Sequence, residues 1–558
     1  MNQARTFLLI AWVLVGYLVW DTWQQDYHRP QPQPAASANA QAALSPLVVE
    51  AGDVPEFKPE SSTSSSVSGA TPDSVSSGKR VRVRTDLLEL EIDSSGASVV
   101  SAKLLAYRQQ PTSGAEPVSL LSTEPLRLFM AQTGYTGNRS DLPTHFSGFE
   151  SDADEYTLAN GAPTLEVPLR WRTADGLSLV RTFRFERGSY TVEVSDRFEN
   201  ASGTPISLKA YRQLVRVQPP ALAGSSFTNP AAYSFVGAAW FSPQTKFDKL
   251  KFSNFADEPL EMTASQGWIA MLEHYFFAAW IPAPDEAQTF TTGIEQNTRY
   301  RVRALGPQQD LAAGGSLESS ARLYLGPKLQ DRLEGVAPGL KLTLDFGIFT
   351  LLAQPMAWLL GTLHDITGNW GWAIILLVVL IKLALFKLSE AQYKSFAKMR
   401  AVQPRIEALK ERYGDDRQKF QTAMMELYKK EKINPMGGCL PILIQIPIFI
   451  SLYWVLIESV ELRHAPWTLW IQNLTAPDPY FILPVLNLLT MWATQKLSPT
   501  PGMDPMQKRI MQIMPIAFGV MFAFFPAGLV LYWTTNGALG LLQQWVITRK
   551  HATLAAKV

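Results

Sequence analysis

Apolar and polar side chains alternate in short runs from residue 79 to residue 340, and turn-forming residues separate the runs. Leu177, Leu179 and Phe183 share one parity, for example, and their run ends before Gly188. A period of two is typical of strands that bury one face in an antiparallel sheet. The pattern therefore predicts a large all-β domain over residues 79–340, built as a β-sandwich.

Long apolar runs dominate the C-terminal third and predict transmembrane helices. Five core spans are expected at about residues 370–388, 437–457, 480–493, 510–525 and 529–546. The third and fourth of these are shorter than the ~20 apolar residues that usually cross a bilayer. Since short spans thin the membrane around them, the pattern predicts an all-α polytopic bundle in a locally thin bilayer.

The first 78 residues divide into an apolar run and a polar segment. Residues 1–20 contain Arg5 and then an apolar stretch that ends at Trp20 without a small-residue cleavage site, which favours an uncleaved signal-anchor helix. Residues 21–78 are rich in Pro, Gln, Ala and Ser. Such a segment buries too little apolar surface to offset its ordering entropy, so we predict a disordered linker.

Residues 341–368, between the β domain and the first core span, have a helical pattern. Phe349, Leu352, Met356 and Leu359 recur at helical spacing. We interpret this segment as an amphipathic helix lying in the membrane interface. A true membrane span is the alternative.

Lysine and arginine are distributed unevenly between the loops. The 389–436 loop is strongly basic, and Lys496, Lys508 and Arg509 follow the span at 480–493, whereas the loop after 437–457 holds only Arg463. The positive-inside rule places the basic loops, and with them both termini and the 549–558 tail, in the cytoplasm. The β domain is then expected on the outer side.

The loop at 389–436 is helical in pattern and predicts an antiparallel helical hairpin. Pro404 suits the first turn of a helix. The turn at 413–416 ends in an Asp pair that suits the cap of the next helix.

Composition and motifs exclude several classes of function but identify none. Lys+Arg is 50 and Asp+Glu is 49, so the chain is not a globally basic nucleic-acid binder. Cys439 is the only cysteine, which excludes an intramolecular disulfide. The sequence also lacks a His-Glu-x-x-His motif, a Cys-x-x-Cys pair, a Gly-x-Ser-x-Gly elbow and a phosphate loop. We therefore expect no enzyme activity, metal or cofactor.

Lys382 is the most informative single residue, because it lies inside an apolar span. Lys382 lies about three residues past the middle of its predicted span, and an ammonium at that depth costs roughly 2.5–3.5 kcal/mol on insertion scales, so it is expected to face a wet cavity. Snorkelling to the cytoplasmic face is the plainer alternative. Further polar residues in the later spans are interhelical hydrogen-bonding partners or, with Lys382, the lining of a hydrated groove: Gln445, Asn487, Thr490, Thr534, Thr535, Asn536 and Gln543.

Several motifs, in order along the chain, resemble the YidC family of membrane protein insertases. They are Gly368–Gly371, Ala391–Tyr393, Ala397–Arg400, Gln403–Pro404, Asn434–Cys439, Gln445–Phe449, Val460–Arg463, Asp504–Gln507 and Phe525–Trp533. In the β region, Gly267–Trp268 and Trp280–Pro282 match the form of the family found in bacteria with an outer membrane.

This resemblance implies a periplasmic β-supersandwich, a five-helix core in the bacterial inner membrane and a hydrophilic groove open to cytoplasm and lipid. The groove cation of the family, usually arginine, aligns with Lys382, which keeps the charge but loses the bidentate fork. A family tyrosine aligns with Trp533, and a threonine contact aligns with Val378. The implied partners are client membrane proteins, the Sec translocon, the ribosome and the lipid bilayer, with no nucleotide.

Two other functions compete with insertion. A small-solute transporter with an outer β-sandwich receptor domain is the leading alternative, although transporters usually contain internal repeats and none is evident in this sequence. A sugar-active β-sandwich is the third hypothesis, but no pair of carboxylates stands out to support it.

Overall fold

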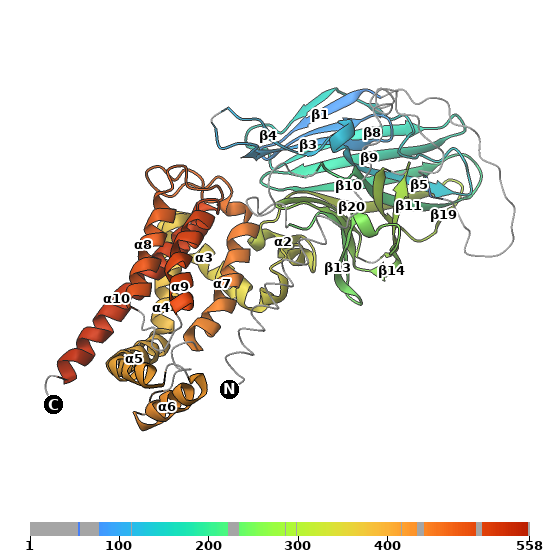
Figure 1. The fold of residues 1–558 in the computed structure, drawn as a ribbon. Coiled ribbons are helices and arrows are strands. Elements are labelled where there is room, and N and C mark those ends of the chain that lie inside the picture. The colour runs from blue at the N-terminus through green and yellow to red at the C-terminus, as the bar shows by residue number, and fades with distance from the viewer. Residues whose placement is uncertain are drawn as a thin grey trace, which may run out of the picture. The chain divides into compact units, whose positions relative to one another are not determined.

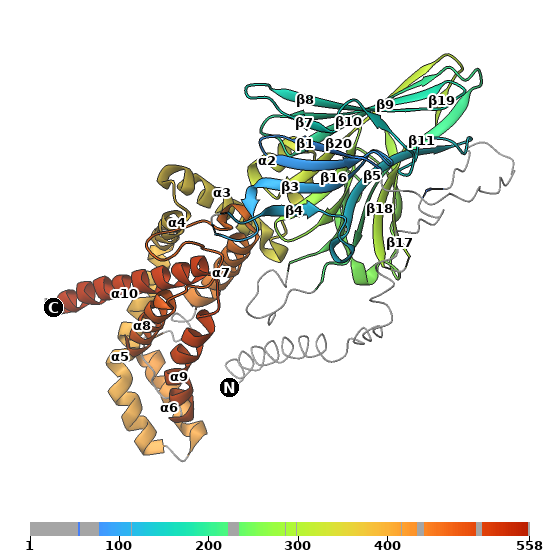
Figure 2. The same cartoon turned by 90° about the horizontal axis from the view of Figure 1, so that it is seen from above.

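The computed structural model describes residues 54–55, 78–112, 114–220, 234–284, 286–296, 298–413, 416–431, 433, 440–497 and 505–555. The predicted signal anchor, nearly all of the predicted linker and Cys439 lie outside the described residues. Figures 1 and 2 give two views of the fold, with the β strands in blue to yellow-green and the later helices in orange to red.

Residues 80–327 form two large sheets within the described part of the chain. The first sheet has eleven strands: β14 (Glu261–Ser265), β17 (Ala287–Glu295), β18 (Arg299–Leu305), β11 (Ile206–Val217), β5 (Phe129–Gly137), β3 (Ser98–Arg108), β2 (Leu88–Asp93), β1 (Arg80–Arg84) and β7 (Glu155–Thr157) in spatial order, with β19 (Gln309–Leu311) beside β11 and β4 (Pro117–Leu121) beside β3. The second has nine: β13 (Lys246–Lys251), β12 (Gly237–Ser242), β15 (Trp268–Leu272), β16 (Phe276–Pro282), β20 (Ser316–Pro327), β10 (Thr191–Asn200), β9 (Leu177–Glu186), β8 (Thr164–Arg172) and β6 (Glu150–Ser151). The predicted all-β architecture is confirmed.

The alternating pattern of β9 shows how the sequence defines the core of this domain. Leu177, Leu179, Phe183 and Phe185 are buried on one face, and Arg181 occupies the same face with no exposed surface. Its guanidinium makes two 2.7 Å hydrogen bonds to the carboxylate of Asp196 on the adjacent strand β10. The buried charge is tolerated because this bidentate pair satisfies it.

The remaining described chain is helical. Its helices are α2 (Gln330–Val336), α3 (Thr350–Thr367), α4 (Trp370–Ala384), α5 (Phe386–Tyr413), α6 (Arg417–Lys430), α7 (Leu440–Glu458), α8 (Ile482–Leu497), α9 (Pro505–Phe522) and α10 (Ala527–Ala555). A helical C-terminal part after a β domain is the arrangement that the sequence predicts. By length and hydropathy, no single helix among the described residues qualifies as a membrane span, whereas α4 and α5 qualify together across a 68° bend.

Two local features of the helices differ from the expectations above. The apolar run at 370–388 is not one helix, because α4 ends at Ala384 and α5 starts at Phe386. Lys382 consequently lies in the last turn of α4, not near the middle of a continuous helix. Pro404 was predicted to begin a helix, and that prediction is wrong: Pro404 lies inside the 28-residue helix α5.

Helices α5 and α6 pack on each other through a small apolar core of their own. Met399, Val402, Ile406 and Tyr428 are buried in it. Asp416 caps α6 by accepting hydrogen bonds from the backbone N–H groups of Gln418 and Lys419, as the sequence predicts. The basic segment is thus a folded helical hairpin (Figure 2).

Candidate functional site: a polar stripe on the last helix

One face of α10 carries two polar side chains, Asn536 and Gln543, that meet polar groups of other helices. Trp533, Asn536, Gly540 and Gln543 are spaced by three or four residues, so they lie along the same side of this helix. From Asn536 to Gln543 the stripe extends about 10 Å along the axis, at ~1.5 Å per residue. We call this face of α10 the polar stripe.

The upper part of the polar stripe bonds to α7. The side-chain amide of Gln445 donates to Oδ1 of Asn536 at 2.9 Å. Both residues were predicted to line a groove, and the structure brings them together across the two helices. A hydrogen-bonded amide pair inside an apolar bundle fixes the rotation of each helix, because breaking it would leave two polar groups unsatisfied.

The lower part of the polar stripe faces Lys382. A Cβ placed on Gly540 would lie 3.7 Å from the Lys382 Nζ and 3.5 Å from the Tyr393 hydroxyl. Tyr393, from α5, donates a 3.0 Å hydrogen bond to the backbone carbonyl of Gly540. Gln543 donates from Nε2 to the backbone carbonyl of Lys382 at 3.4 Å. Lys382 is half-buried here, beside a helix face that carries no side chain at position 540.

The other predicted groove residues have different surroundings. Thr534 donates to the carbonyls of Val530 and Leu483, and Thr490 donates to the carbonyl of Asn487, so both hydroxyls are used within or between α8 and α10. Asn487 is 2% exposed and donates to the Met491 sulfur at 3.8 Å. The structure therefore groups these three residues at the α8–α10 contact, apart from the polar stripe.

Trp533 begins the polar stripe, but its ring packs among aromatic side chains. The ring centroids of Phe449 and Phe522 lie 4.6 Å and 4.0 Å from it. Apolar packing is its observed role.

Sequence reasoning missed two members of the stripe's surroundings. Gly540 has no side chain to attract notice, and Tyr393 was noted only as part of a motif. Gln543 was named with the polar residues that could line a groove together with Lys382, and the structure brings it to the Lys382 carbonyl. The available signal was spacing: Gly540 and Gln543 follow Asn536 by four and seven residues, on the same helix face.

The N-terminal end of α4, opposite the end that carries Lys382, is held in place by the contacts of Asn369 and Gly371. Asn369 caps the helix by accepting from the N–H groups of Gly371 and Trp372, and its own amide donates to the carbonyl of Trp467 at 2.9 Å. Gly371 is in close contact with the Trp467 ring, since a Cβ there would lie 2.1 Å from Cδ1. These contacts explain the residue types at 369 and 371.

The turn between α9 and α10 is fixed by backbone hydrogen bonds. The N–H groups of Ala527 and Gly528 donate to the carbonyls of Ala476 and Leu474 at 2.7 and 2.8 Å. This pairing sets where α10 begins, and therefore the height at which its polar stripe lies.

Polar contacts of His274 and Arg463 join the β strands to the end of α7 and the loop that follows. A ring nitrogen of His274 lies 3.1 Å from the carbonyl oxygen of Ile457. The guanidinium of Arg463 donates to the carbonyls of Arg108 and Gln109, at 2.6 and 3.3 Å. The β domain thus contacts the helical core through specific polar groups.

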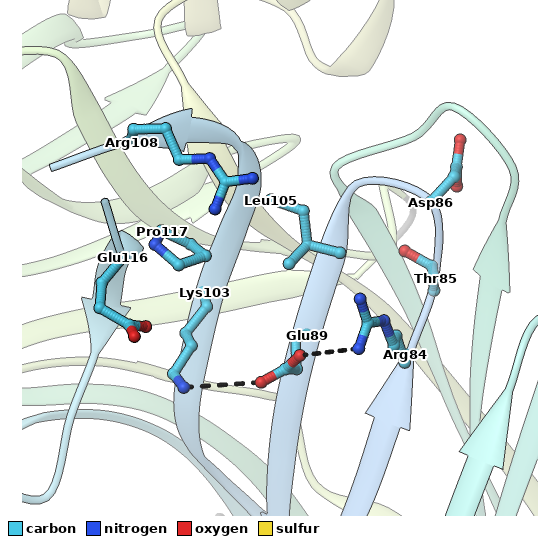
Figure 3. A pocket seen from close by; sticks show the side chains of 9 residues that line it. All are labelled: Arg84, Thr85, Asp86, Glu89, Lys103, Leu105, Arg108, Glu116 and Pro117. Carbon is cyan, nitrogen blue, oxygen red and sulfur yellow. Dashed lines mark ion pairs between the residues drawn. The ribbon is translucent and has the colours of Figure 1, made fainter. Parts of the chain in front are cut away.

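The β domain also has a polar concavity of about 480 Å³, shown in Figure 3. Lys103 and Arg84 both pair with Glu89, at 3.5 and 3.6 Å, and Arg108 and Glu116 also line the space. Opposite charges are interspersed, and the cations drawn are engaged by neighbouring groups. The arrangement shows no convergent set of groups aimed at one ligand.

Comparison with known proteins agrees with this architecture. A family model described as the YidC periplasmic domain matches residues 80–359, and one described as the 60Kd inner membrane protein matches residues 362–554. A membrane protein insertase YidC from Stenotrophomonas maltophilia (strain R551-3) is 46% identical, covering 99% of this chain and 97% of its own. One from Xylella fastidiosa (strain 9a5c) is 45% identical over 100% and 99%. A solved structure described as an active YidC insertase covers 85% of this chain and 93% of its own, with 19% identity and a TM-score of 0.37.

A β-sandwich that matches a periplasmic-domain model, followed by helices that match an inner membrane protein model, defines a multidomain protein of the bacterial inner membrane. The chain belongs to the YidC family of membrane protein insertases. The resemblance found in its motifs is therefore confirmed. The curated relatives are named insertases, and the transporter alternative has no support.

Proposed function

We propose that this protein inserts membrane proteins by way of a hydrophilic groove lined by the polar stripe of α10, with Lys382 and Gln445 on its facing walls. The observation that carries the proposal is the alignment of these groups. Asn536, Gly540 and Gln543 lie on one helix face, and they meet Gln445 from α7 and Lys382 from α4. A polar tail of a client then finds hydrogen-bonding partners inside an otherwise apolar bundle.

The groove is proposed to open to the cytoplasm and sideways to lipid, and to be closed on the outer side. Lys382 lies toward the basic hairpin, whereas the α9–α10 turn and the Asn369 cap are tied down at the other end of the helices. The client's polar tail enters from the cytoplasm, and its apolar part leaves into lipid. Apolar burial, at roughly 25 cal/mol per Å², drives the process without a nucleotide.

A thin membrane beside the groove would further lower the energy barrier for moving a polar client tail across the bilayer. Helices α4 and α8 have 15 and 16 residues. At ~1.5 Å per residue they extend about 22–24 Å, against a hydrocarbon core of ~30 Å. A short distance across the bilayer favours passage of a polar tail.

The proposed topology has five core spans, a signal anchor at residues 1–20, and α3 lying in the interface. The basic hairpin α5–α6 and both termini are cytoplasmic. The hairpin is proposed to meet clients or ribosomes first, and the protein works alone or beside the Sec translocon. Catalysis of a covalent step is not part of this proposal, and the protein needs no cofactor.

Depletion and rescue in cells test this function. Loss of the protein should reduce insertion of a set of inner-membrane proteins, and the unsubstituted chain should restore it. The double variant Gln445→Leu/Asn536→Leu keeps size but removes the polar pair, so it should rescue poorly. Gln512→Leu, at an exposed position of α9, is the matched control. Unchanged insertion after depletion would contradict the function, and full rescue by the double variant would contradict the groove.

A further inference from the structure

In the side-chain amide of Gln543, the nitrogen has a hydrogen-bond partner, whereas the oxygen has none among the described residues. Its Nε2 faces the Lys382 carbonyl at 3.4 Å. A carbonyl only accepts hydrogen bonds, so the nitrogen must be the atom on that side. Oε1 is buried and has no hydrogen-bond partner among the residues that the structure describes. A buried acceptor without a donor is unusual in folded proteins and calls for a ligand or a water.

A donor lies on the same side of the groove. Lys382 Nζ is within 3.7 Å of where a Cβ of residue 540 would be, and Gln543 is three residues further along the same face of α10. The ammonium offers three N–H groups and no acceptor, whereas Gln543 Oε1 offers only an acceptor. One donor and one acceptor therefore lie within about one helical turn of each other along the polar stripe.

Because Gly540 has no side chain, Lys382 can approach the polar stripe closely at this position. Tyr393 occupies the neighbouring position, but its hydroxyl proton is committed to the Gly540 carbonyl at 3.0 Å. Tyr393 therefore holds α5 against α10 and leaves the ammonium as the donor for a ligand.

We infer that Lys382 Nζ and Gln543 Oε1 together bind the backbone C=O and N–H of one residue of an extended client tail, which point to the same side of an extended chain, and this inference rests on the proposed groove. The ammonium donates to the client carbonyl, and Gln543 Oε1 accepts from a client N–H. Every non-proline residue carries this donor–acceptor pair and loses its water on entering the groove. Recognition of the backbone does not depend on the sequence of the tail, and a carboxylate alone would leave Gln543 Oε1 unsatisfied.

Synthetic single-span clients with neutral translocated tails test the inference. One tail is built from glycine and serine, and a matched tail replaces each glycine by N-methylglycine, which keeps every carbonyl but removes half of the N–H groups. The full-length protein is reconstituted in vesicles of bacterial phospholipid, and the rate at which the tail becomes protease-protected is measured against empty vesicles.

Gln543→Met removes the acceptor at nearly constant volume. It should slow insertion of the glycine tail about fivefold, the size expected for one lost hydrogen bond, and should slow the N-methylated tail much less. Lys382→Met should slow both tails, since both retain their carbonyls. Gln512→Met on α9 should slow neither.

Equal slowing of both tails by Gln543→Met would overturn the inference and assign Gln543 to bracing α4. Full activity of Gln543→Met on both tails would overturn it as well. Insertion by the unsubstituted protein no faster than in empty vesicles would overturn the proposed function together with the inference, so the two failures are distinguishable.

Discussion

At the scale of single residues, the role of a buried cation in this protein depends on the groups that surround it. Arg181 and Lys382 are both cations at positions that periodicity assigns to the interior, but their environments differ. Arg181 has a bidentate carboxylate partner, Asp196, and no exposed surface. Lys382 is half-buried beside Gly540, with no acidic partner among the described residues. The first is structural, and the second suits a site.

Lys382 is expected to act as an electrostatic trap. Lys382→Arg should retain insertion because the charge persists. Lys382→Ala and Lys382→Glu should fail most for clients with acidic tails, whose attraction is strengthened by the low dielectric of the groove. Protease protection of client tails that differ only in charge measures this. An equal defect for every tail would rule out the trap and leave the peptide-binding role inferred above or a structural role for Lys382.

His145 is expected to make the β domain sensitive to acid. Burial, reinforced by Arg303 and Arg301, lowers the pKa of His145 to about 3. The unfolded chain therefore binds a proton below about pH 6.5 that the folded chain does not, and stability falls as pH decreases through that window. From pH 7.5 to 5 this residue should cost about 2 kcal/mol.

Urea unfolding followed by limited proteolysis, at both pH values, measures this loss. His145→Gln removes the titrating group and can still accept from the Tyr211 hydroxyl, which lies 2.6 Å from Nδ1 of His145. The variant should lose less stability than the parent on acidification. An unchanged pH dependence would show that other groups control it.

At the scale of elements, much of the fold follows from periodicity, and the exceptions have identifiable causes. Alternation predicts the strands because each buries one face. It does not predict the break at Leu385, where an apolar run continues across a 68° bend. The preference of proline for the first turn of a helix gave the wrong result at Pro404, because the apolar spacing of Met399, Val402 and Ile406 continues across it. Of the groove residues, spacing on α10 groups Asn536 with Gln543, but only tertiary packing separates Thr490 and Thr534 from them.

Gly371 provides a test of how tightly α4 is seated. A Cβ at this position would lie 2.1 Å from the Trp467 ring, so Gly371→Ala must shift the ring or the helix. Overpacking of this kind costs roughly 1–3 kcal/mol. Thermal unfolding in detergent should show a lower midpoint.

Gly361→Ala in α3 is the matched control, because nothing lies within 4 Å of its Cβ. Alanine is the better helix former, so this variant should be neutral or slightly stabilised. A stable Gly371→Ala variant would mean that Trp467 moves aside without cost.

At the scale of the whole molecule, the two parts differ in what they contribute. Every group of the proposed groove follows residue 346, whereas the β domain contributes polar contacts to the end of α7 and the loop after it. The excess of lysine and arginine in the 389–436 loop favours a cytoplasmic location for that side of the helical core.

The topology gives a direct prediction. In a chain carrying Cys439→Ser, a single cysteine placed by Lys410→Cys on the hairpin should resist a membrane-impermeant thiol reagent added to intact cells. The same cysteine should react after the inner membrane is opened. Labelling from outside in intact cells would invert the proposed orientation.

The β domain is expected to be largely dispensable for insertion. A deletion of about residues 80–320 removes His274 and the carbonyls of Arg108 and Gln109, so the end of α7 and Arg463 lose these contacts. The Gln445–Asn536 pair and the surroundings of Lys382 do not involve the deleted strands. The deletion should therefore reduce thermal stability more than it reduces insertion of neutral-tailed clients. A deleted chain that folds and yet inserts no client would show that the β domain positions α7 for function, and the groove would then have to be regarded as assembled jointly by both parts.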